Sequence, residues 1–210
     1  SAGKLTESGN STITGEIKMT AKESVVKSDG GLNVTTDISG YMVVFENNEY
    51  VVVPIVAKIG ETNYYASLQD ATNAANSGDV IKLCTIASMN ENVTAQIPAG
   101  VTIKSNGISI DRSIRMLGDL TLDGPLTITG GLWVGKTEGT LDATLAGDKL
   151  TAKYFMFQHG SYNINADIDA VYGYLSFEAT FEVNSTITTT NTNGEPLYIN
   201  GNVNLNNEAN

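Results

Sequence analysis

The stretch VAKIGETNYYASLQDATNAANSGDVIKL, residues 56–83, contains the segment whose pattern predicts a helix. Ser67 is a favourable N-cap, and Asp70, three residues later, can complete a capping box. Gly78 is expected to end the helix as the residue after its C-cap. The apolar residues that fall on one narrow face at helical spacing are Leu68, Ala71, Ala74 and Ala75. A first strand is expected to follow at Val80, and the pattern downstream indicates strands only.

The chain from residue 80 onward predicts a β-solenoid of about five or six coils. Short β-type runs return at intervals of about 20 residues. Apolar residues alternate within each run with Thr, Asn and Asp, which directs the apolar set inward. A sandwich or jelly roll would show similar short strands. A helix placed where a solenoid end must be covered, together with weak hairpin signals after Gly107, favours the solenoid. The runs begin near Val80, Val101, Leu120, Leu141, Tyr162 and Val183.

The same 56–83 stretch resembles the start of right-handed parallel β-helix modules in bacterial cell-surface proteins, the pectate-lyase-like repeat proteins and adhesins. The resemblance implies an all-β fold, a right-handed parallel β-helix (solenoid) with a short N-terminal capping helix, preceded by a small β segment. It also implies an extracellular location, at the bacterial cell surface or secreted. The matching residues are Val56, Ala57, Ile59, Gly60, Tyr65, Ser67, Leu68, Gln69, Ala71, Ala74, Ala75, Gly78, Asp79, Ile81, Lys82 and Leu83.

Three regions are expected along the chain. Residues 1–54 form a β segment, and its element GYMVVFENNEYVVVP (40–54) resembles the hairpin that closes one surface β-helix module before the next begins. We therefore interpret 1–54 as the end of a preceding module, with a small independent β domain as the alternative. Residues 55–79 form a linker strand and the capping helix. Residues 80–210 form the coils, which stop in mid-pattern, as expected of a fragment whose adjoining modules belong to the same chain.

Composition restricts the partners. The chain carries 12 basic and 23 acidic residues, a formal net charge of −11, and the basic residues are scattered in the sequence. Binding phosphates requires clustered Lys and Arg, so nucleic acid is excluded as a partner and an anionic membrane surface is unfavourable. We expect no membrane insertion, because no apolar run is long enough for a span. Cys84 is the single cysteine, and we interpret it as a small structural residue.

The rival to a binding module is a β-helix polysaccharide lyase or glycoside hydrolase. Such enzymes use converging carboxylates with calcium or with an Arg or Lys base. The single histidine, His159, precedes a Gly-Ser turn and is expected to be a corner residue. We find no enzyme signature, so we expect no catalytic residue, cofactor or metal site. The residues that could have served are Asp111, Arg112, Arg115, Asp119 and Asp123, with Asp142, Asp148, Asp167 and Asp169 outside any motif.

Aromatic residues are the main indication of a binding surface. Of 15 aromatic residues, 8 lie between Tyr154 and Phe181. A coil of about 20 residues would place Tyr154 over Tyr174 and Phe155 over Leu175. Trp133 would extend the column of outward-pointing rings, Tyr154 and Tyr174, by one coil. We therefore predict that Trp133, Tyr154 and Tyr174 bind a ligand, with burial of some of these rings in the core as the alternative.

These observations predict a non-catalytic cell-surface stalk or adhesin module that presents a solenoid face to a glycan or to a surface protein. The alternative is a polysaccharide lyase or glycoside hydrolase of the β-helix type.

Overall fold

A computed structural model describes residues 4–6, 13–85, 94–135, 139–176, 179–192, 194, 196–200 and 202–205. Contacts divide the chain into two compact units, Ser1–Ile55 and Val56–Asn210. The boundary between the units lies next to the boundary expected at residue 54. That residues 1–54 end a preceding module stays a prediction.

The first unit is a small β structure with its own core. A four-stranded sheet has the order β1-β3-β6-β5, and β2 pairs with β4 in a separate parallel pair. Asn47 and Asn48 connect β5 to β6 with φ of 51° and 61°, which is the tight hairpin geometry that this pair of residues favours. The core residues are Met19, Val26, Tyr50 and Val52. The strands are β1 (Lys4–Thr6), β2 (Glu16–Met19), β3 (Val25–Lys27), β4 (Asn33–Thr36), β5 (Tyr41–Glu46) and β6 (Glu49–Pro54).

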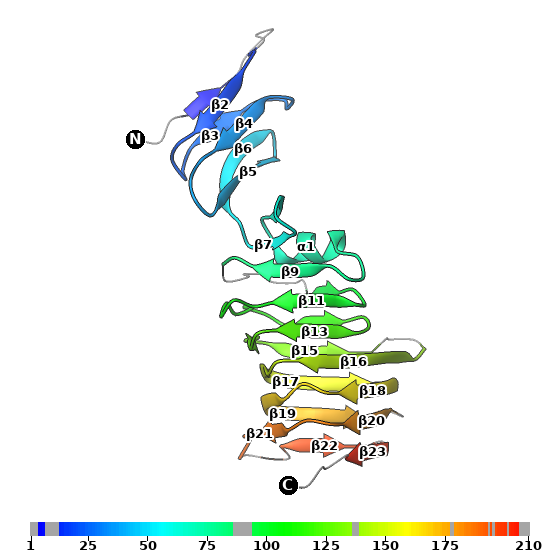
Figure 1. The fold of residues 1–210 in the computed structure, drawn as a ribbon. Helices are drawn as coiled ribbons and strands as arrows, with labels where there is room; N and C mark the ends of the chain where they lie inside the picture. Colours follow the sequence, from blue (N-terminus) through cyan, green and yellow to red (C-terminus); the bar gives the residue numbers. More distant parts are fainter. Residues whose placement is uncertain are drawn as a thin grey trace. The chain divides into compact units, whose positions relative to one another are not determined.

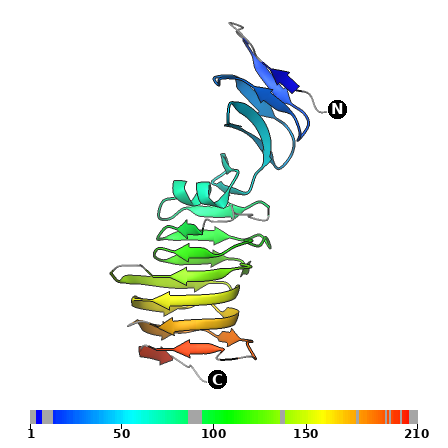
Figure 2. The same ribbon diagram turned by 180° about the vertical axis from the view of Figure 1, so that it is seen from behind.

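The second unit is a parallel β-helix whose coils stack in sequence order from α1 to β23 (Figure 1; Figure 2 shows them from behind). One side is a nine-stranded sheet of order β23-β20-β18-β16-β13-β11-β9-β7-β8. The other is an eight-stranded sheet of order β10-β12-β15-β17-β19-β21, to which β14 and β22 also belong. The elements are β7 (Ala57–Ile59), β8 (Asn63–Tyr65), α1 (Leu68–Ala74), β9 (Val80–Leu83), β10 (Ala95–Ile97), β11 (Val101–Lys104), β12 (Ile114–Met116), β13 (Leu120–Asp123), β14 (Leu126–Thr127), β15 (Gly131–Val134), β16 (Leu141–Gly147), β17 (Leu150–Gln158), β18 (Gly160–Ile164), β19 (Ile168–Ser176), β20 (Thr180–Val183), β21 (Ile187–Thr189), β22 (Leu197–Ile199) and β23 (Asn202–Leu205).

The strand pairing decides between the solenoid and the sandwich. From β9 to β23, all six successive pairs in the nine-stranded sheet are parallel. The predicted fold class, an all-β right-handed parallel β-helix with a short N-terminal helix, is confirmed. The expectation of five or six coils is too low, because these pairs join seven strands.

The N-terminal end of the solenoid is closed by a hairpin together with the helix. Strand β7 pairs antiparallel with β9 and with β8, so the edge that β9, the first coil strand, would otherwise expose is paired. Helix α1 contacts β7, β8 and β10, and its Leu68 and Ala71 are fully buried. The expected covering helix is therefore present, and the hairpin adds a second cover that satisfies the backbone groups of the edge strand.

The helix ends differ in detail from the expectation. Ser67 is the N-cap, and its Oγ accepts a hydrogen bond from Asp70 N at 3.0 Å, as predicted. The expected end at Gly78 is wrong: the C-cap is Ala75, with extended φ and ψ, and Gly78 lies in the following turn with φ of 93°. Ala74 is exposed, and Thr72 is buried in its place. The Thr72 hydroxyl donates a hydrogen bond to Gln69 O, so the buried hydroxyl group is satisfied and the free-energy cost of burying it is small.

Inward-facing apolar side chains fill the described coils. The largest are Phe155, Phe157 and Phe181, which are fully buried, and Tyr162, which is 2% exposed. Phe157 packs edge-on against both Tyr162 and Phe181. The alternation of buried and exposed residues along β11, β13, β16 and β18 is the pattern that places one set inside and the other in solvent.

Candidate functional site

The outer face of the eight-stranded sheet carries two columns of residues that cross successive strands. The tryptophan column consists of Gln96, Arg115, Trp133, Met156, Tyr174 and Tyr198, which are register partners on β10, β12, β15, β17, β19 and β22. The tyrosine column lies two residues earlier in the chain. It contains Thr94 and Ser113, just before β10 and β12, together with Gly131, Tyr154 and Tyr172. We call the two columns together the aromatic face.

The rings of the aromatic face form a continuous chain of contacts. Trp133 meets Tyr154 edge-on with ring centroids 5.7 Å apart. Tyr154 stacks on Tyr172 at 5.6 Å with an interplanar angle of 8°, and Tyr172 meets Tyr174 edge-on at 5.9 Å. Tyr174 lies 6.1 Å from Tyr198. The first four rings are half-buried and Tyr198 is 40% exposed, so the face offers aromatic groups to solvent in a fixed arrangement.

Tyr154 is held in place by contacts to three neighbouring residues. Its hydroxyl accepts a hydrogen bond from Trp133 Nε1 at 2.8 Å and lies 3.4 Å from Ser113 Oγ. Ser113 Oγ in turn accepts from Gly131 N at 2.9 Å. The ring lies over Gly131, where an added Cβ would come within 2.2 Å of ring atoms. Gly131 therefore provides the space for this ring, and the ring loses little further freedom when a ligand binds.

The sequence-derived register of this face is wrong by two residues. Tyr154 pairs with Tyr172, and Phe155 pairs with Gly173 rather than with Leu175. The local coil is 18 residues long, so Trp133 and Tyr174 share one column while Tyr154 lies in the other. The three predicted residues nevertheless lie on one face and are linked through Tyr172. Their role as ligand-binding residues stays a prediction.

The sequence-based prediction of the binding residues did not include Tyr172 or Tyr198, and it did not place Arg115 in the tryptophan column. An 18-residue spacing would have found two of them, since Arg115 precedes Trp133 by 18 residues and Tyr172 follows Tyr154 by the same interval.

A hollow lies at the N-terminal end of the tryptophan column. It has a volume of about 240 Å³ and is lined by Thr94, Gln96, Arg115 and Trp133. Arg115 is half-buried, and within the described ranges it makes no hydrogen bond or ion pair. The hollow thus combines an indole, a guanidinium, an amide and a hydroxyl group, which can bind an anionic or polar group beside an apolar one.

The acidic residues weighed as catalytic groups instead connect successive coils. Asp119 Oδ1 accepts from Thr144 N at 2.7 Å, and Asp167 Oδ1 accepts from Thr186 N at 2.8 Å. Asp142, Asp148 and Asp111 make similar bonds to Ser161 N, Gly124 N and Thr129 Oγ1, and Asp123 and Asp169 form ion pairs with Lys104 and Lys149. Carboxylates engaged in this way stabilise corners, and they are spread along the helix rather than gathered in one groove.

The other reactive residue types have structural environments as well. His159 lies at a corner with φ of 51°, and its carbonyl accepts from Leu141 N. Cys84 is exposed after β9, and partial burial raises the pKa of its thiol, which disfavours the reactive thiolate. Among the residues that the structure describes, no group of three or more His, Cys, Asp or Glu side chains could hold a metal ion.

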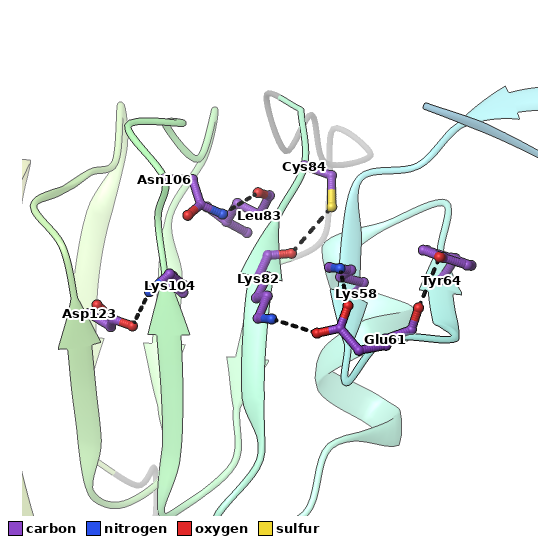
Figure 3. A network of polar contacts seen from close by, with 9 residues as sticks. All are labelled: Lys58, Glu61, Tyr64, Lys82, Leu83, Cys84, Lys104, Asn106 and Asp123. Carbon is purple, nitrogen blue, oxygen red and sulfur yellow. Dashed lines mark hydrogen bonds and ion pairs between the residues drawn. The ribbon is translucent and has the colours of Figure 1, made fainter. Parts of the chain in front are cut away.

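Three lysines that are scattered in the sequence are stacked by the fold. Lys58, Lys82 and Lys104 are register partners on β7, β9 and β11 (Figure 3). Glu61 lies 3.0 Å from Lys58 Nζ and 3.1 Å from Lys82 Nζ, and these hydrogen bonds lower the pKa of its carboxyl group. Lys104 Nζ lies 2.6 Å from Asp123 Oδ2. Because each lysine has a carboxylate partner, the ladder holds the closing hairpin against β9 and offers little free charge to an anionic polymer.

Fold and face together define a parallel β-helix module with an aromatic outer face. The model of the TamB C-terminal domain matches residues 2–208, so the chain belongs to the TamB C-terminal domain family. Neither a curated protein nor a solved structure gives a significant match. The family found differs from the pectate-lyase-like surface proteins that residues 56–83 resemble, and what the findings support of that resemblance is the β-solenoid.

The TamB domain belongs to a protein of the bacterial envelope. The expected location at the bacterial surface therefore holds at the coarser level of the cell envelope. Within the described part of the chain, α1 is too short to cross a membrane as a helix.

Proposed function

We propose that this chain is a non-catalytic β-helix module of the bacterial envelope that binds a ligand on its aromatic face. Membership of the TamB family suggests that the binding serves the assembly or transport of outer-membrane proteins. The adhesin interpretation, in which the same face meets a glycan or a surface protein outside the cell, is the second candidate. The two candidates share the site and differ in the ligand.

One observation carries the proposal. The aromatic face contains Trp133, Met156 and four tyrosines on neighbouring strands, with Arg115 as its one charged member. The chain as a whole has a net charge of −11. Contiguous apolar patches are uncommon on the surface of soluble proteins, and the larger ones mark binding sites.

The packed interior supports a function at the surface. Inward positions along the described coils are occupied by buried Leu, Ile, Val and Phe, and protein interiors of this kind are close-packed. A transported molecule would therefore contact the outer faces of these coils.

The test replaces Trp133 and Tyr174 with alanine in the native gene. We expect the strain to show reduced levels of folded outer-membrane proteins, as a deletion strain would, while the variant protein accumulates normally. Thr121, exposed on the outer face of the nine-stranded sheet, provides the control Thr121→Ala, which should behave as wild type. Normal outer-membrane proteins in the double variant, alongside loss in the deletion strain, would contradict the proposal. Binding of the purified protein to a glycan array, lost in the double variant, would favour the adhesin candidate.

A further inference from the structure

The composition of the aromatic face indicates a protein partner. Its two columns combine Trp, Tyr, Met and Arg side chains with small or uncharged polar ones, and Asp, Glu and Lys do not occur among these eleven positions. Enrichment in Trp, Tyr, Met and Arg with depletion of Lys, Asp and Glu distinguishes the centre of protein interfaces from other surface. Trp, Tyr and Arg are also the residues most often found at binding hot spots.

The orientation of the rings disfavours a glycan. A sugar ring stacks on an aromatic side chain only where one ring face is open. One face of Tyr154 is covered by Tyr172, in a nearly parallel stack, and Gly131 lies directly beneath the ring. The central ring of the face therefore offers a ligand its edge rather than an open face, and its hydroxyl group is already bonded to Trp133.

Arg115 defines what the partner must supply. A ligand that covers the aromatic face would desolvate this half-buried guanidinium, which has no partner within the described ranges. Desolvation of an unpaired charge is costly, and a carboxylate is the acceptor that matches a guanidinium through two parallel hydrogen bonds. The hollow beside Trp133, with its volume of about 240 Å³, has room for one such side chain.

The size of the face suits a peptide segment rather than a folded domain. Six strands at a spacing of about 4.8 Å give a length of about 24 Å, which an extended segment of about seven residues would match. The two columns lie about 7 Å apart, so the face is far smaller than the roughly 800 Å² per partner of a standard interface between folded proteins.

From these observations we propose that the aromatic face binds a short extended segment of a partner polypeptide, whose Asp or Glu carboxylate enters the hollow and pairs with Arg115. Apolar or aromatic side chains of the segment lie along Tyr174 and Tyr198. This inference rests on the proposed function, because it assumes that the aromatic face is the binding surface.

The test selects binders from a displayed library of random 12-residue peptides on the purified chain. Binding of labelled synthetic peptides is measured by fluorescence anisotropy. The emission of Trp133, the one tryptophan of the chain, reports whether a peptide binds at the hollow. We expect the selected peptides to share an Asp or Glu. Replacing that residue by Asn or Gln should weaken binding roughly 10- to 100-fold, the range for a charge-assisted hydrogen bond.

Arg115→Gln should weaken binding by a similar factor and should make the peptide substitution inconsequential. Lys153→Gln, which removes an exposed positive charge from β17, should leave binding within twofold. The peptide substitution needs no change in the protein, so it remains decisive if a variant folds poorly.

Two failures can be told apart. If Trp133→Ala and Tyr174→Ala abolish binding while neither Arg115→Gln nor the peptide substitution matters, the carboxylate inference is overturned and the binding face stands. If peptides bind equally well to all variants, the aromatic face is not the site and the proposed function fails as well. Selection of no peptide, together with glycan binding that depends on Trp133, would show that the partner is a glycan.

Discussion

Gly173→Ala tests the strand register that organises both the core and the aromatic face. Gly173 pairs with Phe155 on β17 and with Leu197 on β22, at an inward position. A Cβ added there would lie 2.0–2.6 Å from three atoms of the Phe155 ring. That ring is fully buried and packs edge-on against Phe157 with centroids 6.1 Å apart, so it has little room to move.

Overpacking of this kind typically costs about 1–3 kcal/mol. For a unit of this size the cost corresponds to a decrease in Tm of about 2–12 °C. Urea unfolding followed by circular dichroism would measure it directly. Phe155→Leu alone should also destabilise, because it leaves part of a buried cavity empty. In the double variant the smaller side chain accommodates the new methyl group, so the combined loss should be smaller than the sum by about 0.5–3 kcal/mol.

The alternative register makes a different prediction. A 20-residue coil would place Gly173 opposite Lys153, an exposed residue of β17, where an added methyl group meets no buried ring. A Gly173→Ala variant as stable as wild type, or strictly additive effects in the double variant, would refute the 18-residue register.

Three further predictions concern the helix, a buried phenol and the enzyme alternative. Leu68→Asp should lower the free energy of unfolding by about 3–5 kcal/mol, because it forces an unpaired charge into a fully buried position. Ala74→Asp, on the exposed side of α1, should change Tm little, and equal Tm values for the two variants would contradict the burial of Leu68. Burial raises the pKa of Tyr162 to about 12, above its unfolded value of about 10, so its contribution to the free energy of unfolding is complete below pH 10 and is lost as pH rises towards 12. Tyr162→Phe should remove this pH dependence and should cost about 1 kcal/mol at pH 7 through the lost bond to Gln158 O. A variant whose stability depends on pH in the same way as wild type would contradict this. The purified chain should release no unsaturated sugars from acidic polysaccharides, with or without calcium, and calcium-dependent release that disappears in Arg112→Ala or Arg115→Ala would establish the enzyme alternative.

The positions of the coils could be predicted from the sequence because the inward residues are apolar. The expected starts at Val80, Val101, Leu120 and Leu141 coincide with the first residues of β9, β11, β13 and β16. The next two expected starts fall within β18 and β20. Alternation with a period of two identifies which side chains point inward, and the covering helix was recognisable from its N-cap.

The composition of the aromatic face could not be predicted because alternation does not fix which residues are neighbours. A shift of two residues preserves every inward and outward assignment, so Tyr154 could be placed against either Tyr172 or Tyr174. The coil lengths that decide between them vary. The offset between register partners is 18 residues from Ile114 to Leu132, 23 from Leu132 to Phe155, and 18 from Phe155 to Gly173. Corners absorb these differences without changing the strands, and the sequence does not mark where they do so.

Site-specific photocrosslinking in the native bacterium tests most directly whether the aromatic face is the functional surface of this envelope module. A photoreactive phenylalanine derivative is placed at Tyr174 in one strain and at Thr121, on the outer face of the nine-stranded sheet, in another. The account predicts a discrete protein adduct from position 174, weakened by Arg115→Gln, and none from position 121. Adducts of equal yield at both positions, or an adduct at position 121 alone, would contradict it.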